Sequence, residues 1–470
     1  MITGRPLLAV VALSVGACAH YQHYQPAPVY SRNDAGAHAS AYAQRSLADP
    51  ALVPLFRAHD LAVPDSLWSA TQLALAAVYF RPDLTVAQRR ITLARAAEIT
   101  AGVRPYPSVG GTVGRASHAT EGRSSPWTFS LNAGFTVERG GKRGARIAQA
   151  RAATLAAELR GESMLWQTIE AARQDAAIAA AADGDVTDAL AELAAQRRAV
   201  GLLRARYAEG QLSRTDLARS EADLQSSVVG LTQATRARTD ARATLARAVG
   251  VPVEQVNAIR VRPEARSACI VADSIGMPAL EVLALRSRAD IGVSLADYAV
   301  TEAELRTQIT QQYPDISIGP GLAWDQGVAR WILSLGLPSL PVDRARGPIG
   351  EAVARRALQA ATVRSVQDSV LADVDSATAM CSQAAQEIAA TDSLVDANAG
   401  ALRSVRATYD RGEIGQTEVA LADLALVRAQ RTRHQAGQRL VGAGYAVERA
   451  VGALLSTPTL DWQHSYDLHH

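Results

Sequence analysis

Hydrophobic and polar or small residues alternate in two places along the chain, strictly in the first of them. The first alternating run is Thr128 to Val137, and the second is Ile316 to Leu337, which a short loop at 325–329 interrupts. A period of two residues is typical of β-strands that have one apolar face and one polar face. The pattern predicts two hairpins, with strands at about 108–115 and 128–138 in the first and at about 315–324 and 330–338 in the second.

A helical period follows each predicted hairpin over a long stretch. Apolar residues recur every three to four positions from Lys142 to Tyr207 and from Arg344 to Tyr409, which predicts helices about 100 Å long. Shorter helices then return, from Ser213 to Gly250 and from Gln416 to Gly452. Ala is abundant and Phe is scarce, a composition that suits closely packed long helices.

The turn between the long helix and the returning helix occurs twice. Four residue types keep their places with a shift of 202 residues: Tyr207, Gly210, Thr215 and Asp216 are matched by Tyr409, Gly412, Thr417 and Glu418. Each Gly is placed to end a helix in the left-handed conformation. Ser213 with Asp216 has capping-box spacing, and Gly415 with Glu418 repeats it with a weaker cap. Each copy is therefore predicted to be the tip of a helical hairpin, at about 208–213 and 410–415.

The helices before each hairpin also repeat, here with an offset of 207 residues. A helical pattern from Ser66 breaks at Pro82 and continues to Gly102, and a second one from Ala279 breaks at Ala289 and ends by Pro314. We therefore expect two repeats, 65–252 and 279–455, joined by a connector at 253–278 that holds short strands and one short helix. The expected fold is mainly α, with a pair of β-hairpins.

The N-terminus has the pattern of a bacterial lipoprotein signal. Arg5 precedes the apolar run Leu7 to Val15, which is too short to span a bilayer, and small residues then lead to Cys18. We expect residues 1–17 to be removed and Cys18 to carry a lipid; the alternative is an ordinary signal peptide. Residues 18–64 are predicted to be an extended tether and 456–470 a tail.

Two interpretations of the hairpins remain open, half-buried strands of a soluble sheet and transmembrane strands. Export and the lack of other strands favour the second, with the following side chains facing lipid: Phe129, Leu131, Phe135, Trp331, Leu333 and Leu335. Four strands cannot close a barrel, and open strand edges are not tolerated in lipid. A transmembrane sheet therefore predicts an oligomer.

Composition excludes several classes of function. The net charge is +2, and acidic and basic residues are mixed along the chain, so the basic surface that nucleic-acid binding needs is not indicated. No hydrolase, phosphate-loop or dinucleotide motif is present in the sequence. We therefore expect no enzyme and no cofactor. Cys269 and Cys381 lack zinc-site spacing, and the histidines of the tether and tail do not converge, so no metal site is expected. Separate thiols are favoured for the two cysteines, with a disulfide as the alternative.

From about Ser66 to Leu455 the chain resembles the TolC family of outer-membrane efflux proteins. The tandem halves, the hairpins, the Tyr-x-x-Gly tips and the segment Leu337 to Ile349 carry the resemblance. Glu138 to Ile147 resembles the equivalent segment of the heavy-metal branch, the CzcC-like proteins, and the lipidated cysteine is similar to that of OprM-like and CusC-like members.

The resemblance implies a homotrimer with a shared twelve-stranded outer-membrane barrel, a periplasmic helical cylinder, and tips that face an adaptor and an inner-membrane pump. The residues expected to contact the adaptor are Gln211, Leu212, Ser213, Glu413, Ile414 and Gly415. Glu418, with Asp216, is expected to gate the lumen, although an acid at this position can also cap its helix. Leu421 stands where the family has a second gate acid, and Asp423 lies elsewhere on the helix.

The function expected from the sequence is an outer-membrane channel of a tripartite efflux system, lipid-anchored, for small molecules or metal ions. One alternative is the outer channel of a type I protein-secretion system, and another is a periplasmic coiled-coil adaptor or spacer without a pore. The sequence does not name a substrate.

Overall fold

The computed structural model describes residues 32–115, 125–263, 268–325, 327–337 and 342–455. The chain divides into two units, Met1–Arg45 and Ser46–His470. The described part of the first unit is a 3-10 turn, η1 (Arg32–Asp34), followed by α2 (Ala35–Ala43). The predicted signal peptide 1–17, the lipid site Cys18 and the tail 456–470 lie outside the described residues.

The segment predicted as an extended tether contains helices. Besides α2, helix α3 (Leu52–Ala58) belongs to the second unit and buries Leu52, Leu55 and Phe56. Helix α2 is Ala-rich, and Ala has the highest helix propensity. Helix α3 forms because its apolar side chains pack on the core, a contact that a reading of composition does not reveal.

The four predicted strands form one antiparallel sheet, in the order β2-β3-β5-β6. Their bounds are β2 (Ser108–Arg115), β3 (Trp127–Val137), β5 (Ile316–Asp325) and β6 (Val328–Gly336). In the register, Leu131 lies opposite Leu322, which lies opposite Trp331. The pairing of β3 with β5 joins the two repeats, so the apolar residues of both hairpins share one face.

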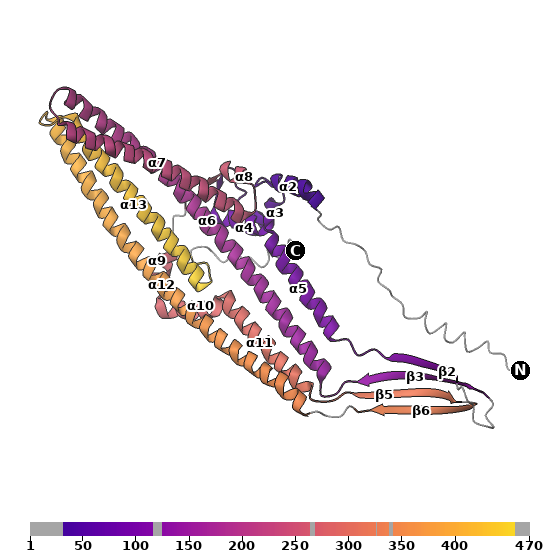
Figure 1. Ribbon diagram of the computed structural model, residues 1–470. Helices are drawn as coiled ribbons and strands as arrows, with labels where there is room; N and C mark the ends of the chain where they lie inside the picture. The colour runs from indigo at the N-terminus through magenta and orange to yellow at the C-terminus, as the bar shows by residue number, and fades with distance from the viewer. Residues whose placement is uncertain (1–31, 116–124, 264–267, 326, 338–341, 456–470) are drawn as a thin grey trace. The chain divides into compact units, whose positions relative to one another are not determined.

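Four long helices follow the sheet: α6 (Lys142–Ala208), α7 (Arg214–Val249), α12 (Val342–Asp410) and α13 (Gln416–Val451). As Figure 1 shows, α7 folds back along α6 and α13 folds back along α12. Helix α13 also contacts α6, so the repeats meet along a second seam. Helix α12 begins at Val342, two residues before the predicted start at Arg344, and includes Pro348.

Two pairs of shorter helices precede the hairpins: α4 (Ala70–Phe80) with α5 (Pro82–Ala101), and α10 (Met277–Ser287) with α11 (Ala289–Thr310). Leu67, expected in the first helix, instead lies in β1 (Leu67–Trp68), which pairs in parallel with β4 (Arg260–Val261). The helix starts later because Ser69 and Gln72 form a capping box.

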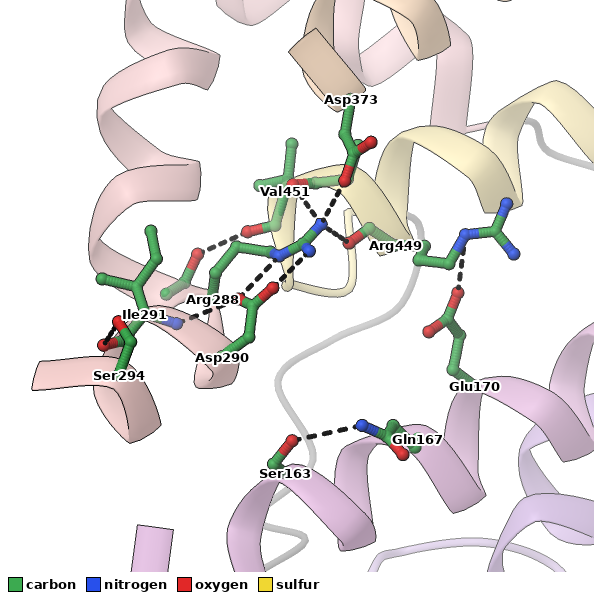
Figure 2. A network of polar contacts seen from close by, with 12 residues as sticks. Ser163, Gln167, Glu170, Arg288, Asp290, Ile291, Ser294, Asp373, Arg449 and Val451 are labelled. Atoms are coloured by element: carbon green, nitrogen blue, oxygen red, sulfur yellow. Dashed lines mark hydrogen bonds and ion pairs between the residues drawn. The ribbon is translucent and has the colours of Figure 1, made fainter. Parts of the chain in front are cut away.

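In both repeats, an arginine at the break between the two short helices forms an ion pair and a hydrogen bond that stabilise the break. Arg81 forms an ion pair with Asp83 and donates to the carbonyl of Arg247 at 3.3 Å. In the second repeat, Arg288 pairs with Asp290 at 2.6 Å and donates to the carbonyl of Arg449 at 3.2 Å (Figure 2). Both contacts tie the break to the end of the returning helix.

Two apolar cores, one in each repeat, lie beside these breaks. The first surrounds α4 and includes Leu73, Leu245 and Val249. The second joins α10, α12, α13 and α9 (Ala268–Ile275), which follows α8 (Val253–Asn257) in the connector. The connector thus has two short helices where one was expected.

Cys269 and Cys381 form a disulfide, so the expectation of two separate thiols is wrong. The cysteines are 112 residues apart in sequence, but α9 packs against α12 and brings their Cα atoms within 5.4 Å. Sequence spacing alone does not predict such a pair, because the tertiary packing decides whether the geometry is met.

Candidate functional site

The first tip is a tight turn, and the helix that follows it has a side-chain cap. Helix α6 ends at Ala208, Gly210 has φ +74°, and the amide of Gln211 donates to the carbonyl of Arg206 at 2.8 Å. The Ser213 Oγ accepts from the Asp216 amide at 3.1 Å and donates to the Asp216 carboxylate at 2.7 Å. Asp216 therefore takes part in the N-terminal cap of α7.

The second tip has the same backbone path with a weaker cap. Gly412 has φ +74°, and the amide of Glu413 donates to the carbonyl of Thr408 at 3.2 Å. Gly415 occupies the N-cap position of α13 and makes no side-chain cap hydrogen bond. Arg411 forms an ion pair with Glu413 at 2.6 Å across the turn.

Glu418 forms an ion pair with Arg206 from the other repeat. The guanidinium of Arg206, near the end of α6, lies 2.9 Å from the carboxylate of Glu418, in the first turn of α13. Both side chains are half-exposed. The partner could not be found from the sequence because 212 residues separate the two. The contact makes Glu418 a link between the tips, in addition to the two roles weighed for it.

Asp423 binds two arginines, one turn and a half further along α13. Arg198 lies 2.8 Å away on α6, and Arg406 lies 3.9 Å away on α12. Leu421 is 43% exposed. Asp423 thus connects three helices below the tips.

The residues expected to contact an adaptor lie on the turns themselves. Gln211, Ser213, Glu413 and Gly415 are exposed, while Leu212 and Ile414 are half-buried. The two tyrosines before the turns, Tyr207 and Tyr409, are each 42% exposed. The apolar Leu212 and Ile414 sit at matching positions, so each tip presents one apolar residue with polar neighbours.

At the other end of the long helices, the apolar face of the sheet is exposed. The six side chains expected to face lipid have exposed fractions from 43% to 86%, and are Phe129, Leu131, Phe135, Trp331, Leu333 and Leu335. Phe129 stacks on Trp324 with ring centroids 6.1 Å apart. The opposite face carries small residues: a Cβ on Gly321 would lie 2.4 Å from the Asn132 carboxamide oxygen.

Charged groups also lie inside the helical part. Arg173 on α6 and Glu448 on α13 are almost fully buried and form an ion pair at 2.8 Å, with Arg173 also 5.2 Å from the centre of the Tyr445 ring. Burial raises the pKa of Glu170, one turn before Arg173, to about 7, and the nearby Arg449 opposes that rise (Figure 2).

No single helix among the described residues is both long and apolar enough to cross a membrane. One bent pair, α9 with α10, passes that test by length and composition only.

The family model of outer membrane efflux proteins matches residues 74–251. No match was found among curated proteins. The fold is similar to that of the outer-membrane channel OprN, with 19% identity, a TM-score of 0.68, and coverage of 83% of this chain and 91% of that chain.

Two further solved structures are similar over most of their length. The outer membrane protein VceC from Vibrio cholerae has 18% identity and a TM-score of 0.64, covering 82% of this chain and 97% of that one. CusC has 15% identity and a TM-score of 0.63, covering 93% and 100%. The outer membrane efflux protein model thus matches the first repeat, and the fold over most of the chain is similar to that of these outer-membrane proteins.

Proposed function

We propose that the protein is the outer-membrane channel of a tripartite efflux system. The observation that carries the proposal is the four-stranded sheet. Exposed apolar side chains cover one of its faces, and mostly small or polar residues line the other. Exposing such an apolar face to water costs free energy, whereas the acyl chains of lipid can cover it without that cost. A soluble adaptor or spacer does not need an exposed apolar sheet face.

The functional assembly in this proposal is a homotrimer. Strands β2 and β6 are the edges of the sheet, and their backbone groups need partners in lipid. Three copies give twelve strands, enough to close a barrel, and the paired long helices of three copies would form a periplasmic cylinder. Cys18 would carry a lipid that anchors the assembly in the outer membrane.

The tips in this proposal face a periplasmic adaptor and an inner-membrane pump. Their exposed polar residues and the half-buried Leu212 and Ile414 would make the contact. Cargo would be small molecules or metal ions that the pump selects, because a wide passive lumen has little selectivity of its own. The channel of a type I secretion system has the same architecture and remains the second candidate.

Conductance of the purified protein in a planar bilayer tests the proposal. We expect discrete channels together with a trimeric mass in detergent. A monomer that gives no discrete channel at any voltage would overturn the proposal.

The gate is tested with Glu418→Gln in the same bilayers. If the carboxylates of three copies line the constriction, cation preference should fall. Arg206→Gln is the matched control, because it breaks the same ion pair and keeps the carboxylate. Equal selectivity in all three proteins would rule out the gate role and leave Glu418 as a link between the tips.

A further inference from the structure

We propose that Asp185 and His434 bind a divalent transition-metal ion between α6 and α13, and that Asp188 orients the imidazole of His434. One ligand atom from each of the three side chains lies within 4.8 Å of the others. All three residues are half-buried, so water can reach the site and complete the coordination. This site lies on the seam between the repeats, away from the tips, and does not depend on the proposed channel function.

The carboxylates of Asp185 and Asp188 differ from those of neighbouring acids on α6. Asp183 pairs with Arg242 at 2.6 Å, and Glu192 pairs with Arg431 at 2.6 Å. Within the part of the chain that the structure describes, neither Asp185 nor Asp188 has an arginine or lysine within ion-pair distance. Two adjacent carboxylates therefore lack a permanent positive charge, and a divalent cation would supply it.

The hydrogen bonds of His434 leave one ring nitrogen available. Its Nδ1 lies 2.5 Å from the Asp188 carboxylate, which can only accept, so Nδ1 carries a hydrogen. In the neutral ring Nε2 then has a lone pair, and its contact with the Gln438 amide nitrogen is long, at 3.5 Å. A carboxylate that orients an imidazole in this way is a common feature of metal-binding histidines.

One amide nitrogen now occupies the point toward which the acceptors converge. The Nε2 of Gln438 lies 3.0 Å from the Ala181 carbonyl, 3.2 Å from the Asp185 carboxylate and 3.5 Å from Nε2 of His434. An amide nitrogen has two hydrogens, so it cannot satisfy three acceptors. A cation at this point would bind Asp185 and His434 together.

Gly184 lets the imidazole come this close. A Cβ at Gly184 would lie 2.2 Å from Cε1 of His434, so the ring rests against the backbone of α6. Gly inside a helix costs about 1 kcal/mol relative to Ala, and here it makes room for the ring. By the offset of 202 residues, the matching positions in the other repeat are Thr232, Glu387 and Ala390, which lack a histidine.

The ligand set indicates the class of metal. One imidazole with carboxylates suits Zn²⁺, Co²⁺ or Ni²⁺ better than Mg²⁺ or Ca²⁺, which prefer oxygen ligands alone. Tetrahedral zinc bonds of about 2.1 Å place ligand atoms about 3.4 Å apart, so Asp185 and His434 would close slightly on binding, with water at the remaining positions. The ion would clamp α6 to α13.

The test titrates the full-length protein, purified without a polyhistidine tag, with CoCl₂ and follows the visible absorption of cobalt. ZnCl₂ should displace the cobalt and raise the thermal midpoint of unfolding. We expect His434→Gln and Asp185→Asn to weaken binding more than about tenfold. Asp392→Asn is the matched control, because Asp392 pairs with Arg433 on a different face of α13.

Gly184→Ala is the second variant, because it keeps every ligand and favours the helix but displaces the imidazole. It should weaken cobalt binding without lowering helix content. The proposal is overturned if wild type gives no cobalt spectrum, or if His434→Gln and Gly184→Ala both bind cobalt as wild type does. A thermal midpoint of unfolding that changes with pH but not with zinc would also overturn the proposed metal site. The imidazolium of His434, rather than a metal ion, would then balance the charge of Asp188.

Discussion

At the scale of single residues, the ion pair between Arg173 and Glu448 lies deeply buried inside the helical part. Their side chains are 1% and 3% exposed. Two charges taken out of water stabilise a fold only while they remain together. The pair fixes the registration of α13 on α6, because either charge alone would be buried without compensation.

Arg173→Met should destabilise the protein by about 3–5 kcal/mol, because it leaves Glu448 charged and buried. Denaturant unfolding followed by circular dichroism measures the loss. The double variant Arg173→Met with Glu448→Leu is the control and should recover most of the stability, since no buried charge remains. A single variant as stable as wild type would show that the pair contributes nothing.

Glu170 makes stability depend on pH. Its pKa is raised from 4.5 to about 7, so the folded state favours the protonated form. That stabilisation is complete below the unfolded pKa and is lost as pH rises through about 7. Glu170→Gln should therefore raise the thermal midpoint relative to wild type at pH 8 and make little difference at pH 4.

Glu387→Gln is the control for that measurement, because Arg439 lowers the pKa of Glu387 and its contribution has the opposite sign. That contribution is present above the unfolded pKa and is lost as pH falls through the lowered value. A Glu170→Gln protein with the same pH profile as wild type would contradict the assignment.

At the scale of elements, the two tips have one backbone path and different caps. Ser213 caps α7 with its hydroxyl, whereas Gly415 offers α13 no side chain. The second tip instead has the Arg411–Glu413 and Arg206–Glu418 ion pairs around it. Side-chain contacts, rather than a cap, hold the start of α13.

Ser213→Ala should loosen the first turn of α7 by about 1 kcal/mol, because the Asp216 amide loses its acceptor. Hydrogen exchange of the amides from Arg214 to Leu217 measures the change locally. Ser213→Gly is the control at the same position and should cost only a few tenths of a kcal/mol. Identical exchange in the serine and alanine proteins would show that the hydroxyl does not cap the helix.

At the scale of the whole molecule, long-range contacts join parts of the chain that the repeats keep apart in sequence. The disulfide ties the connector helix α9 to α12, and the β3–β5 pairing ties the two hairpins together. The rest of the connector is held by non-covalent contacts, of α8 with α7 and of β4 with β1 and α6. The disulfide adds a covalent link at α9.

Cys381→Ser should lower the free energy of unfolding by about 5 kcal/mol, as the chain-entropy estimate for a loop of this length suggests. Guanidine unfolding with and without a reductant measures the effect. Reduced wild type serves as the control and should match the variant. If reduction leaves the unfolding curve of wild type unchanged, the bridge does not contribute.

Periodicity and turn chemistry are local properties, and they were enough to predict the strands, the long helices, the two tips and the tandem repeat. They required only neighbours within a few residues: alternation for a strand, apolar spacing for a helix, Gly for a left-handed turn. The same local reasoning failed for α3, because that helix depends on burying Phe56 against distant residues.

Tertiary packing alone decided which distant side chains meet. The Arg206–Glu418 pair spans 212 residues, Cys269–Cys381 spans 112, and the Asp188–His434 contact at the proposed metal site spans 246. No local pattern carries such information, because a shift of one residue in the packing of α13 on α6 would separate every one of the α6–α13 contacts. The sequence by itself determined the elements and their repeat, and the folded chain determined the sites between them.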